Sequence, residues 1–155
     1  MTDQINQIMA VMDGAFDPCW GEAWNRRQVS DALATPNTHC LLAQSDGDPS
    51  SAAGFLLSRA APGEEEILLL AVLPEYRRRG IAARLMTNYK QAAKARGAER
   101  LFLEVRVNNP AIAFYRAHGF APVGRRREYY RQRNGSYLEA ITFAHNIADI
   151  ADSPV

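Results

Sequence analysis

The segment Leu68–Ala83 constrains the fold of this chain more than any other stretch. It opens with a continuous apolar run, Leu68–Val72, which is typical of a buried strand. Pro74 ends the strand, an arginine-rich turn with Gly80 follows, and an amphipathic helix then begins. The first turn of a helix presents main-chain N–H groups and a partial positive charge, and a glycine lets an anion approach the backbone closely. The segment therefore predicts an anion-binding turn between a buried strand and a helix.

Length and composition favour one globular domain spanning residues 1–155. The chain has 47% hydrophobic and 23% charged residues, which allows a substantial core, and its formal net charge is +1. A net charge so close to zero argues against general nucleic-acid binding. The two cysteines, Cys19 and Cys40, cannot form a disulfide framework, the sequence has no CxxC zinc motif, and its first residues lack the features of a signal peptide. These features predict a cytoplasmic protein without a metal site.

Hydrophobic spacing and turn residues predict the order helix, helix, three strands, helix, strand, helix and hairpin. The expected helices run from Thr2 to about Gly14, over Arg26–Ala34, from Gly80 to about Gly97, and from a cap at Asn108 or Asn109 to Gly119. The expected strands are Thr38–Gln44, Ala53–Ser58, Glu66–Leu73, Arg100–Arg106, Pro122–Tyr130 and Tyr137–Phe143. The last two strands flank Arg133-Asn134-Gly135, a strong hairpin signal, and the tail after His145 has no predicted partner.

This order predicts an α/β fold in which a mixed central sheet is flanked by helices. The first three strands are expected to form an antiparallel meander, and Glu66–Arg106 a right-handed strand–helix–strand crossover. The crossover helix carries an apolar stripe made of Ile81, Leu85, Met86, Tyr89 and Ala93. A ligand is expected to bind where the strands that end at Val72 and Arg106 separate.

Two sets of residues together resemble the GCN5-related N-acetyltransferase (GNAT) superfamily. The first is Arg77-x-x-Gly80-x-Ala82, which has the spacing of that family's pyrophosphate loop. The second begins with Leu103-Glu104-Val105-Arg106, continues through Asn108–Tyr115 and ends at Gly119-Phe120. Leu103–Arg106 and the Tyr129-Tyr130 pair also resemble the bacterial ribosomal-protein-alanine N-acetyltransferase branch. The resemblance covers nearly the whole chain, except that the family's edge strand before the first helix is expected to be short or missing.

The resemblance implies an acyltransferase enzyme that uses acetyl-CoA as cosubstrate and needs no metal. The implied contacts with acetyl-CoA come from the backbone of Leu70, Ala71 and Val72, from the loop residues Arg77, Arg78, Arg79, Gly80, Ile81, Ala82 and Ala83, and from Asn108 and Tyr115. Asn109 is an alternative to Asn108, because the chain is one residue shorter than the family pattern between Glu104 and the asparagine.

Glu104 and Tyr115 are the candidate catalytic base and acid. Glu104 lies on a largely apolar strand, and a partly desolvated carboxylate is a better base than one in water. The phenol of Tyr115 has an ordinary pKa of about 10, which is close to the pKa of a thiol. It can therefore donate a proton to the leaving thiolate. The competing interpretations are an arginine-paired Glu104 and a Tyr115 that only packs in the core.

The acceptor is expected to be a primary amine, in particular a protein N-terminal α-amine. Acidic side chains that could recognise a protonated amine are Asp17, Glu22 and Glu139. A small-molecule amine is the near alternative. A non-catalytic acyl-CoA sensor, and an RNA- or ribosome-binding module that uses Arg125–Arg133, are alternatives from other classes. The presence of both Glu104 and Tyr115 argues against a sensor.

Overall fold

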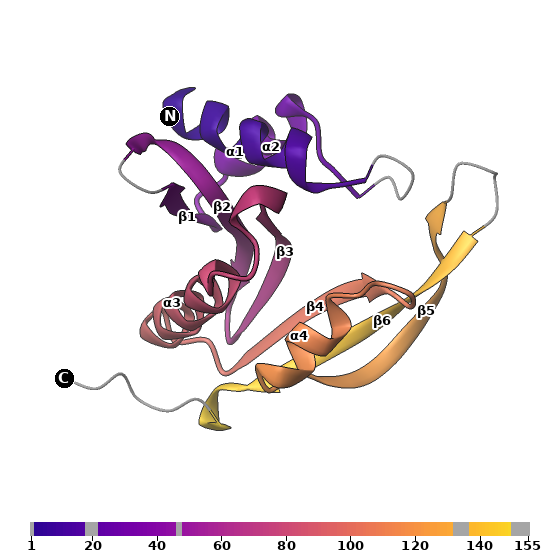
Figure 1. The fold of residues 1–155 in the computed structure, drawn as a ribbon. Helices are drawn as coiled ribbons and strands as arrows, with labels where there is room; N and C mark the ends of the chain where they lie inside the picture. Colours follow the sequence, from indigo (N-terminus) through magenta and orange to yellow (C-terminus); the bar gives the residue numbers. More distant parts are fainter. Residues whose placement is uncertain (1, 18–21, 46–47, 132–136, 150–155) are drawn as a thin grey trace.

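The computed structural model describes residues 2–17, 22–45, 48–131 and 137–149, and these residues form a mixed six-stranded sheet with helices on both faces (Figure 1). The strand order is β1-β2-β3-β4-β6-β5. The helices are α1 (Thr2–Ala15), α2 (Arg26–Leu33), α3 (Ile81–Ala95) and α4 (Ile112–Ala117), with 3-10 turns at Pro74–Tyr76 and Ile147–Asp149. The strands are β1 (Thr38–Ser45), β2 (Asp48–Ala61), β3 (Glu64–Val72), β4 (Arg100–Arg106), β5 (Ala121–Arg131) and β6 (Tyr137–Asn146). The predicted fold class is confirmed, and α1 is the first described element.

The antiparallel meander of β1, β2 and β3 separates two apolar cores. Along β2, Phe55 and Leu57 are buried in the core under α1 and α2, whereas Leu56 is buried in the core under α3. Side chains alternate between the faces of a strand, so a strand covered on both faces needs a continuous apolar run. This explains why β2 and β3 are both rich in apolar residues, and why their apolar runs predicted them as strands.

Helix α3 packs on the sheet through the predicted stripe. Its buried residues are Ile81, Leu85, Met86, Tyr89 and Ala93. Gly97 follows the helix with a φ of +90°, and the N–H of Ala98 donates to the carbonyl of Ala93 across a distance of 3.0 Å. A left-handed residue that closes a helix in this way is commonly glycine. The predicted helix and its glycine end are therefore confirmed.

The parallel strands β3 and β4 pair only at their beginnings. The register runs from Glu64 opposite Arg100 to Glu66 opposite Phe102, and the described chain has no further ladder pair between these strands. Beyond that point β3 continues beside β2, while β4 stays paired with β6 along its whole length. The strands diverge toward their carboxyl ends, as Figure 1 shows, and this is where the sequence predicted a ligand site.

The C-terminal half consists of β4, β6 and β5 with α4 against them. Strands β5 and β6 form the predicted hairpin, whereas its expected turn at Arg133-Asn134-Gly135 lies outside the described residues. Gly119 follows α4 with a φ of +93° and lies against the ring of His145 on β6. The buried side chains of Tyr115 and Phe120 belong to the same core as α3. This packing fixes the height at which Tyr115 lies above the sheet.

Some predicted boundaries are wrong. Strand β2 begins at Asp48 rather than Ala53, because it continues to pair with β1. Helix α4 begins after Ala111, not after a capping asparagine at 108 or 109. The described part of the tail, up to residue 149, has a partner, since the N–H of Ile147 donates to the carbonyl of Glu99 across a distance of 2.9 Å; residues 150–155 lie outside the described structure. In the ranges that the structure describes, every helix is too short or too polar to cross a membrane.

Candidate active site

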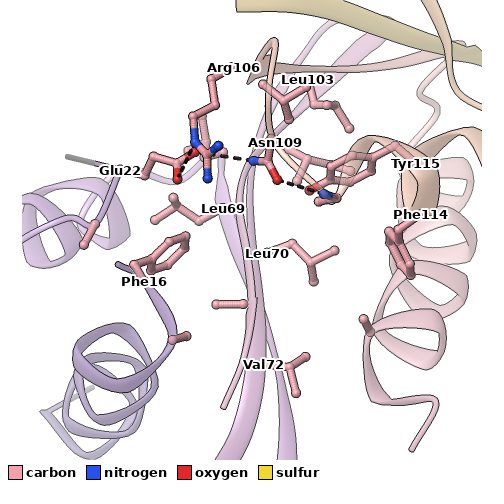
Figure 2. A pocket seen from close by; sticks show the side chains of 18 of the residues that line it. Phe16, Glu22, Leu69, Leu70, Val72, Leu103, Arg106, Asn109, Phe114 and Tyr115 are labelled. Atoms are coloured by element: carbon pink, nitrogen blue, oxygen red, sulfur yellow. Dashed lines mark hydrogen bonds and ion pairs between the residues drawn. The ribbon is translucent and has the colours of Figure 1, made fainter. Parts of the chain in front are cut away.

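A cavity of about 690 Å³ fills the gap between the diverging strands β3 and β4 (Figure 2). Its walls are β3 from Glu66 to Val72, β4 from Leu103 to Arg106, and the starts of α3 and α4. The segment between α1 and α2 closes the remaining side with Phe16, Asp17, Glu22, Ala23 and Trp24, and Gln28 from α2. The predicted residues Leu70, Ala71, Val72, Arg77, Ala82, Glu104 and Tyr115 all line this cavity. The structure therefore brings together residues from four separate segments of the sequence.

The edge of β3 that faces the cavity is available to an extended ligand. Because pairing with β4 stops at Glu66, the main chain from Leu68 onward has no ladder with β4 in the described structure. The side chains of Leu69 and Ala71 are meanwhile buried under α1. Main-chain groups alternate between the two edges of a strand, and the N–H of Leu73 donates to the carbonyl of Ala53 on β2. Leu69 and Ala71 therefore bond to β2 and pack the core, while the backbone groups of Leu70 and Val72 face the open edge.

The arginine-rich turn has one arginine that is already engaged. Arg77 donates from Nε to the carbonyl of Val72 and from Nη2 to the carbonyl of Ala15, with both donor–acceptor distances 3.0 Å. It thereby ties the ends of β3 and α1 together. Arg79 lies over the ring of Tyr76, with its Cζ 5.3 Å from the ring centroid. We therefore assign the Arg77 side chain to holding the turn.

Two left-handed residues shape the end of this turn. Arg78 has a φ of +64° and Gly80 a φ of +76°. Gly80 is the N-cap of α3, and no side chain of the described residues caps this helix end. A Cβ added at Gly80 would have no described atom within 4 Å, so space is open beside the first N–H groups of α3. Arg78, Arg79, Gly80, Ile81 and Ala83 adjoin the cavity in sequence without lining it, and Ile81 is buried in the core.

Glu104 lies half-buried in the wall formed by β4. It is opposite Thr142 of β6, and its neighbours Leu103 and Val105 point into the core. This alternation matches the sequence prediction and places Glu104 on the opposite face of β4 from Leu103 and Val105, and all three residues line the cavity. A carboxylate is thus placed at the point where β3 and β4 have separated.

Tyr115 approaches the same cavity from α4. Its side chain is buried, and its ring makes edge contacts with the rings of Phe114 and Phe120 at centroid distances of 5.6 and 6.0 Å. Burial, and to a lesser degree the negative charge of Glu22, raises the pKa of Tyr115 above its ordinary value. The phenol is therefore held in its protonated form, which is the form that can donate a proton.

The two candidate asparagines lie in different places. Asn109 lines the cavity, and its Oδ1 accepts a hydrogen bond from the N–H of Ala111 with a donor–acceptor distance of 2.8 Å. Asn108 is not among the lining residues, and its Oδ1 accepts from Nη1 of Arg106 across a distance of 2.9 Å. Of the two alternatives that the sequence left open, Asn109 is the one at the cavity.

The acidic residues proposed for amine recognition are largely matched by arginines. Glu22 forms an ion pair with Arg106, and Glu139 forms one with Arg125 at 3.0 Å. Asp17 lines the cavity, whereas Glu139 does not. The described residues contain no cluster of three or more histidine, cysteine or acidic side chains arranged to hold a metal.

Sequence reasoning missed the contributions of Trp24 and Gln28. A signal for them was present, because Asn25 and Gln28 form a capping box at the start of α2, with both donor–acceptor distances 2.8 Å. The pattern Asn-x-x-Gln before a helix marks such a start. It would have placed Trp24 just outside α2 and Gln28 in its first turn.

Comparison with known proteins agrees with this geometry. A model of the acetyltransferase (GNAT) family matches residues 6–120. The chain is 41% identical over 117 residues to the N-alpha-acetyltransferase RimI of Mycobacterium tuberculosis, covering 74% of this chain and 69% of that protein. It is 34% identical over 84 residues to the ribosomal protein bS18-alanine N-acetyltransferase of Escherichia coli K12, covering 54% of this chain and 57% of that protein.

The fold comparison extends over the whole chain. The crystal structure of the ribosomal-protein-S18-alanine N-acetyltransferase from Escherichia coli superimposes with a TM-score of 0.82 at 25% identity, covering 100% of this chain and 94% of that chain. The matched residues 6–120 include the arginine-rich turn, Glu104 and Tyr115. The chain therefore belongs to the GNAT family of acetyltransferases.

Proposed function

We propose that this protein transfers an acetyl group from acetyl-CoA to a primary amine, specifically the N-terminal α-amine of a protein. The observation that carries the proposal is that Glu104 and Tyr115 line one cavity beside the unladdered edge of β3 and near the start of α3. The named activities of the relatives, N-terminal acetyltransferases of Mycobacterium tuberculosis and Escherichia coli, support a protein N-terminus as the acceptor. A cytoplasmic location stays a prediction from the sequence.

The residues present fit acetyl-CoA, which supplies an acetyl group on a thioester. In the predicted segment Leu70, Ala71 and Val72, the backbone groups of Leu70 and Val72 face the open edge of β3 and would pair with an extended pantetheine-like chain. The N–H groups at the start of α3, beside the left-handed Gly80, suit a pyrophosphate, since a helix start is an anion site. Arg78 and Arg79 add positive charge beside it. Asn109 and Tyr115 line the same cavity and would contact the cosubstrate there.

Glu104 and Tyr115 then divide the proton transfers. Glu104 takes a proton from the incoming ammonium, which frees the amine's electron pair to attack the thioester carbonyl carbon. The carbon–sulfur bond breaks as the carbon–nitrogen bond forms, and Tyr115 donates its proton to the departing sulfur. The acetylated nitrogen then loses its second proton, which restores the phenol of Tyr115, and Glu104 releases the first proton to water. A phenol is protonated near neutral pH, and burial of Tyr115 raises its pKa further, so Tyr115 enters the reaction protonated. General acid or base groups of this kind contribute typically ~10²–10⁴-fold to rate.

The test compares acceptors and variants in one assay. The protein is incubated with acetyl-CoA and a panel of N-terminal peptides and small amines, and products are read by mass. The proposal expects peptide N-termini to be acetylated faster than small amines, with Glu104→Gln and Tyr115→Phe each slower than the parent protein. Faster acetylation of a small amine would favour the small-molecule alternative. Binding of acetyl-CoA without product from any acceptor would favour the sensor.

A further inference from the structure

Glu22 and Arg106 form a mostly buried ion pair in the wall of the cavity. Oε1 of Glu22 lies 3.2 Å from Nε of Arg106, and the side chains are only 14% and 8% exposed. The residues are far apart in sequence: Glu22 lies between α1 and α2, whereas Arg106 is the last residue of β4. Figure 2 shows the two side chains meeting beside Asn109.

Stability alone is a weak reason to bury such a pair. Removing two charges from water costs several kcal/mol per ion, and an apolar pair of similar volume is often as stable. A second ion pair of the described residues lies away from the cavity: the buried Glu65 accepts two bonds of 2.8 Å each from Arg96, whose side chain is 29% exposed. That second pair provides a comparison for what a purely structural buried pair does.

The carboxylate of Glu22 contacts both the end of β4 and the turn before α4. One oxygen faces Arg106, two residues after Glu104 on the same side of β4. The other oxygen is 3.5 Å from Nδ2 of Asn109, whose Oδ1 accepts the N–H of Ala111 at the start of α4. Helix α4 carries Tyr115, and the charge of Glu22 contributes to the raised pKa of that residue. Glu22 therefore connects the segment before α2 with both elements that carry the candidate acid and base.

We propose that Glu22 is a positioning residue for acetyl transfer, which fixes the turn between β4 and α4 and the height of Tyr115 over the cavity. This inference rests on the proposed function. Its charge is matched by Arg106, so Glu22 acts through its partners and does not serve as the anchor of the incoming ammonium. The role that the sequence suggested for Glu22 is accordingly replaced by one in the geometry of the site.

The experiment compares Glu22→Gln with Glu65→Gln as the matched control. Each variant removes the charge of a largely buried carboxylate that is paired with an arginine, and of the two carboxylates Glu22 lines the cavity whereas Glu65 does not. Three quantities are measured on folded protein, well below its unfolding temperature: kcat and acceptor KM, the acetyl-CoA concentration for half-maximal thermal shift, and amide hydrogen exchange of residues 107–117. Glu22→Asp, which keeps the charge on a shorter side chain, is a second variant in case Glu22→Gln does not fold.

Glu22→Gln should lower kcat by at least about tenfold, since a misplacement of about 1 Å can cost ~10²-fold. The acetyl-CoA concentration for half-maximal thermal shift should stay within twofold of the parent value. Amide hydrogen exchange of residues 107–117 should become faster. Glu65→Gln should lose stability without these changes, and Glu22→Asp should lie between parent and Glu22→Gln.

The inference is overturned if folded Glu22→Gln keeps the parental kcat, or if Glu65→Gln loses as much kcat at an equal loss of stability. Hydrogen exchange needs no substrate and separates this inference from the proposed function. A parent protein that acetylates no acceptor refutes the proposed function, and unchanged exchange in Glu22→Gln then refutes the positioning role as well.

Discussion

Replacement of Gly119 by alanine tests the packing that places α4 and Tyr115. Gly119 has a φ of +93°, a backbone angle that residues other than glycine rarely adopt. A Cβ there would lie 2.7 Å from Cε1 and 2.9 Å from Nδ1 of the buried His145 ring. The ring belongs to β6, and its centroid lies 5.4 Å from that of the Phe120 ring, so it has little room to move away from the added Cβ.

The size of the effect follows from two costs. The left-handed backbone costs a non-glycine residue about 1–2 kcal/mol. Overpacking against the ring of His145 adds about 1–3 kcal/mol. The sum of about 2–5 kcal/mol corresponds to a fall in Tm of about 4–20 °C for a domain of this size.

Gly97→Ala is the matched control for Gly119→Ala. Gly97 has nearly the same φ, +90°, but a Cβ there has no described atom within 4 Å, so only the backbone cost applies. Urea and thermal unfolding of both variants would measure the difference. If Gly119→Ala costs no more than Gly97→Ala, the proposed overlap with His145 is wrong. If it costs more, adding His145→Ala to Gly119→Ala should recover part of the excess in a double-mutant cycle.

Four further predictions concern the cavity. Gly80→Glu should abolish the thermal shift given by CoA, because a carboxylate would face the pyrophosphate. Gly80→Ala carries the same backbone strain without the charge and should keep most of the thermal shift. Glu104→Gln should lower turnover most at moderate pH, where the amine arrives protonated, and a defect equal at every pH would contradict a role as simple base. Tyr115→Phe should keep CoA binding but lose turnover by ~10²–10⁴-fold. Folding raises the pKa of Tyr115, so the parent protein should lose stability as the pH rises above about 10. This loss of stability should be smaller in Tyr115→Phe. Arg77→Met should lower the free energy of unfolding by about 1–2 kcal/mol through two lost hydrogen bonds to carbonyls, and an unchanged unfolding midpoint would show that this tether contributes nothing.

Much of the fold could be predicted because the signals are local. The buried stripe of α3 follows from a 3.6-residue period, and the alternation around Glu104 follows from the two-residue period of a strand. The order of elements predicted a parallel crossover from β3 to β4 with a ligand site at the carboxyl ends of these strands. The positions of Glu104 and Tyr115 on one cavity were predictable for the same reason, with the family resemblance naming the chemistry.

The sequence by itself determined which segments are helices and strands, where the glycine and arginine turn before α3 lies and which strand carries the candidate base. Tertiary structure alone decided the partners of the charged and polar groups. Arg77 binds the carbonyl of Ala15, 62 residues away, and Asn109 reaches Glu22 across 87 residues. Periodicity reports the neighbours of a residue along its own element, whereas these contacts depend on how distant elements are stacked. The segment before α2 could therefore be recognised as a loop in the sequence, but the ion pair of its Glu22 with Arg106 on β4 exists only in the folded chain.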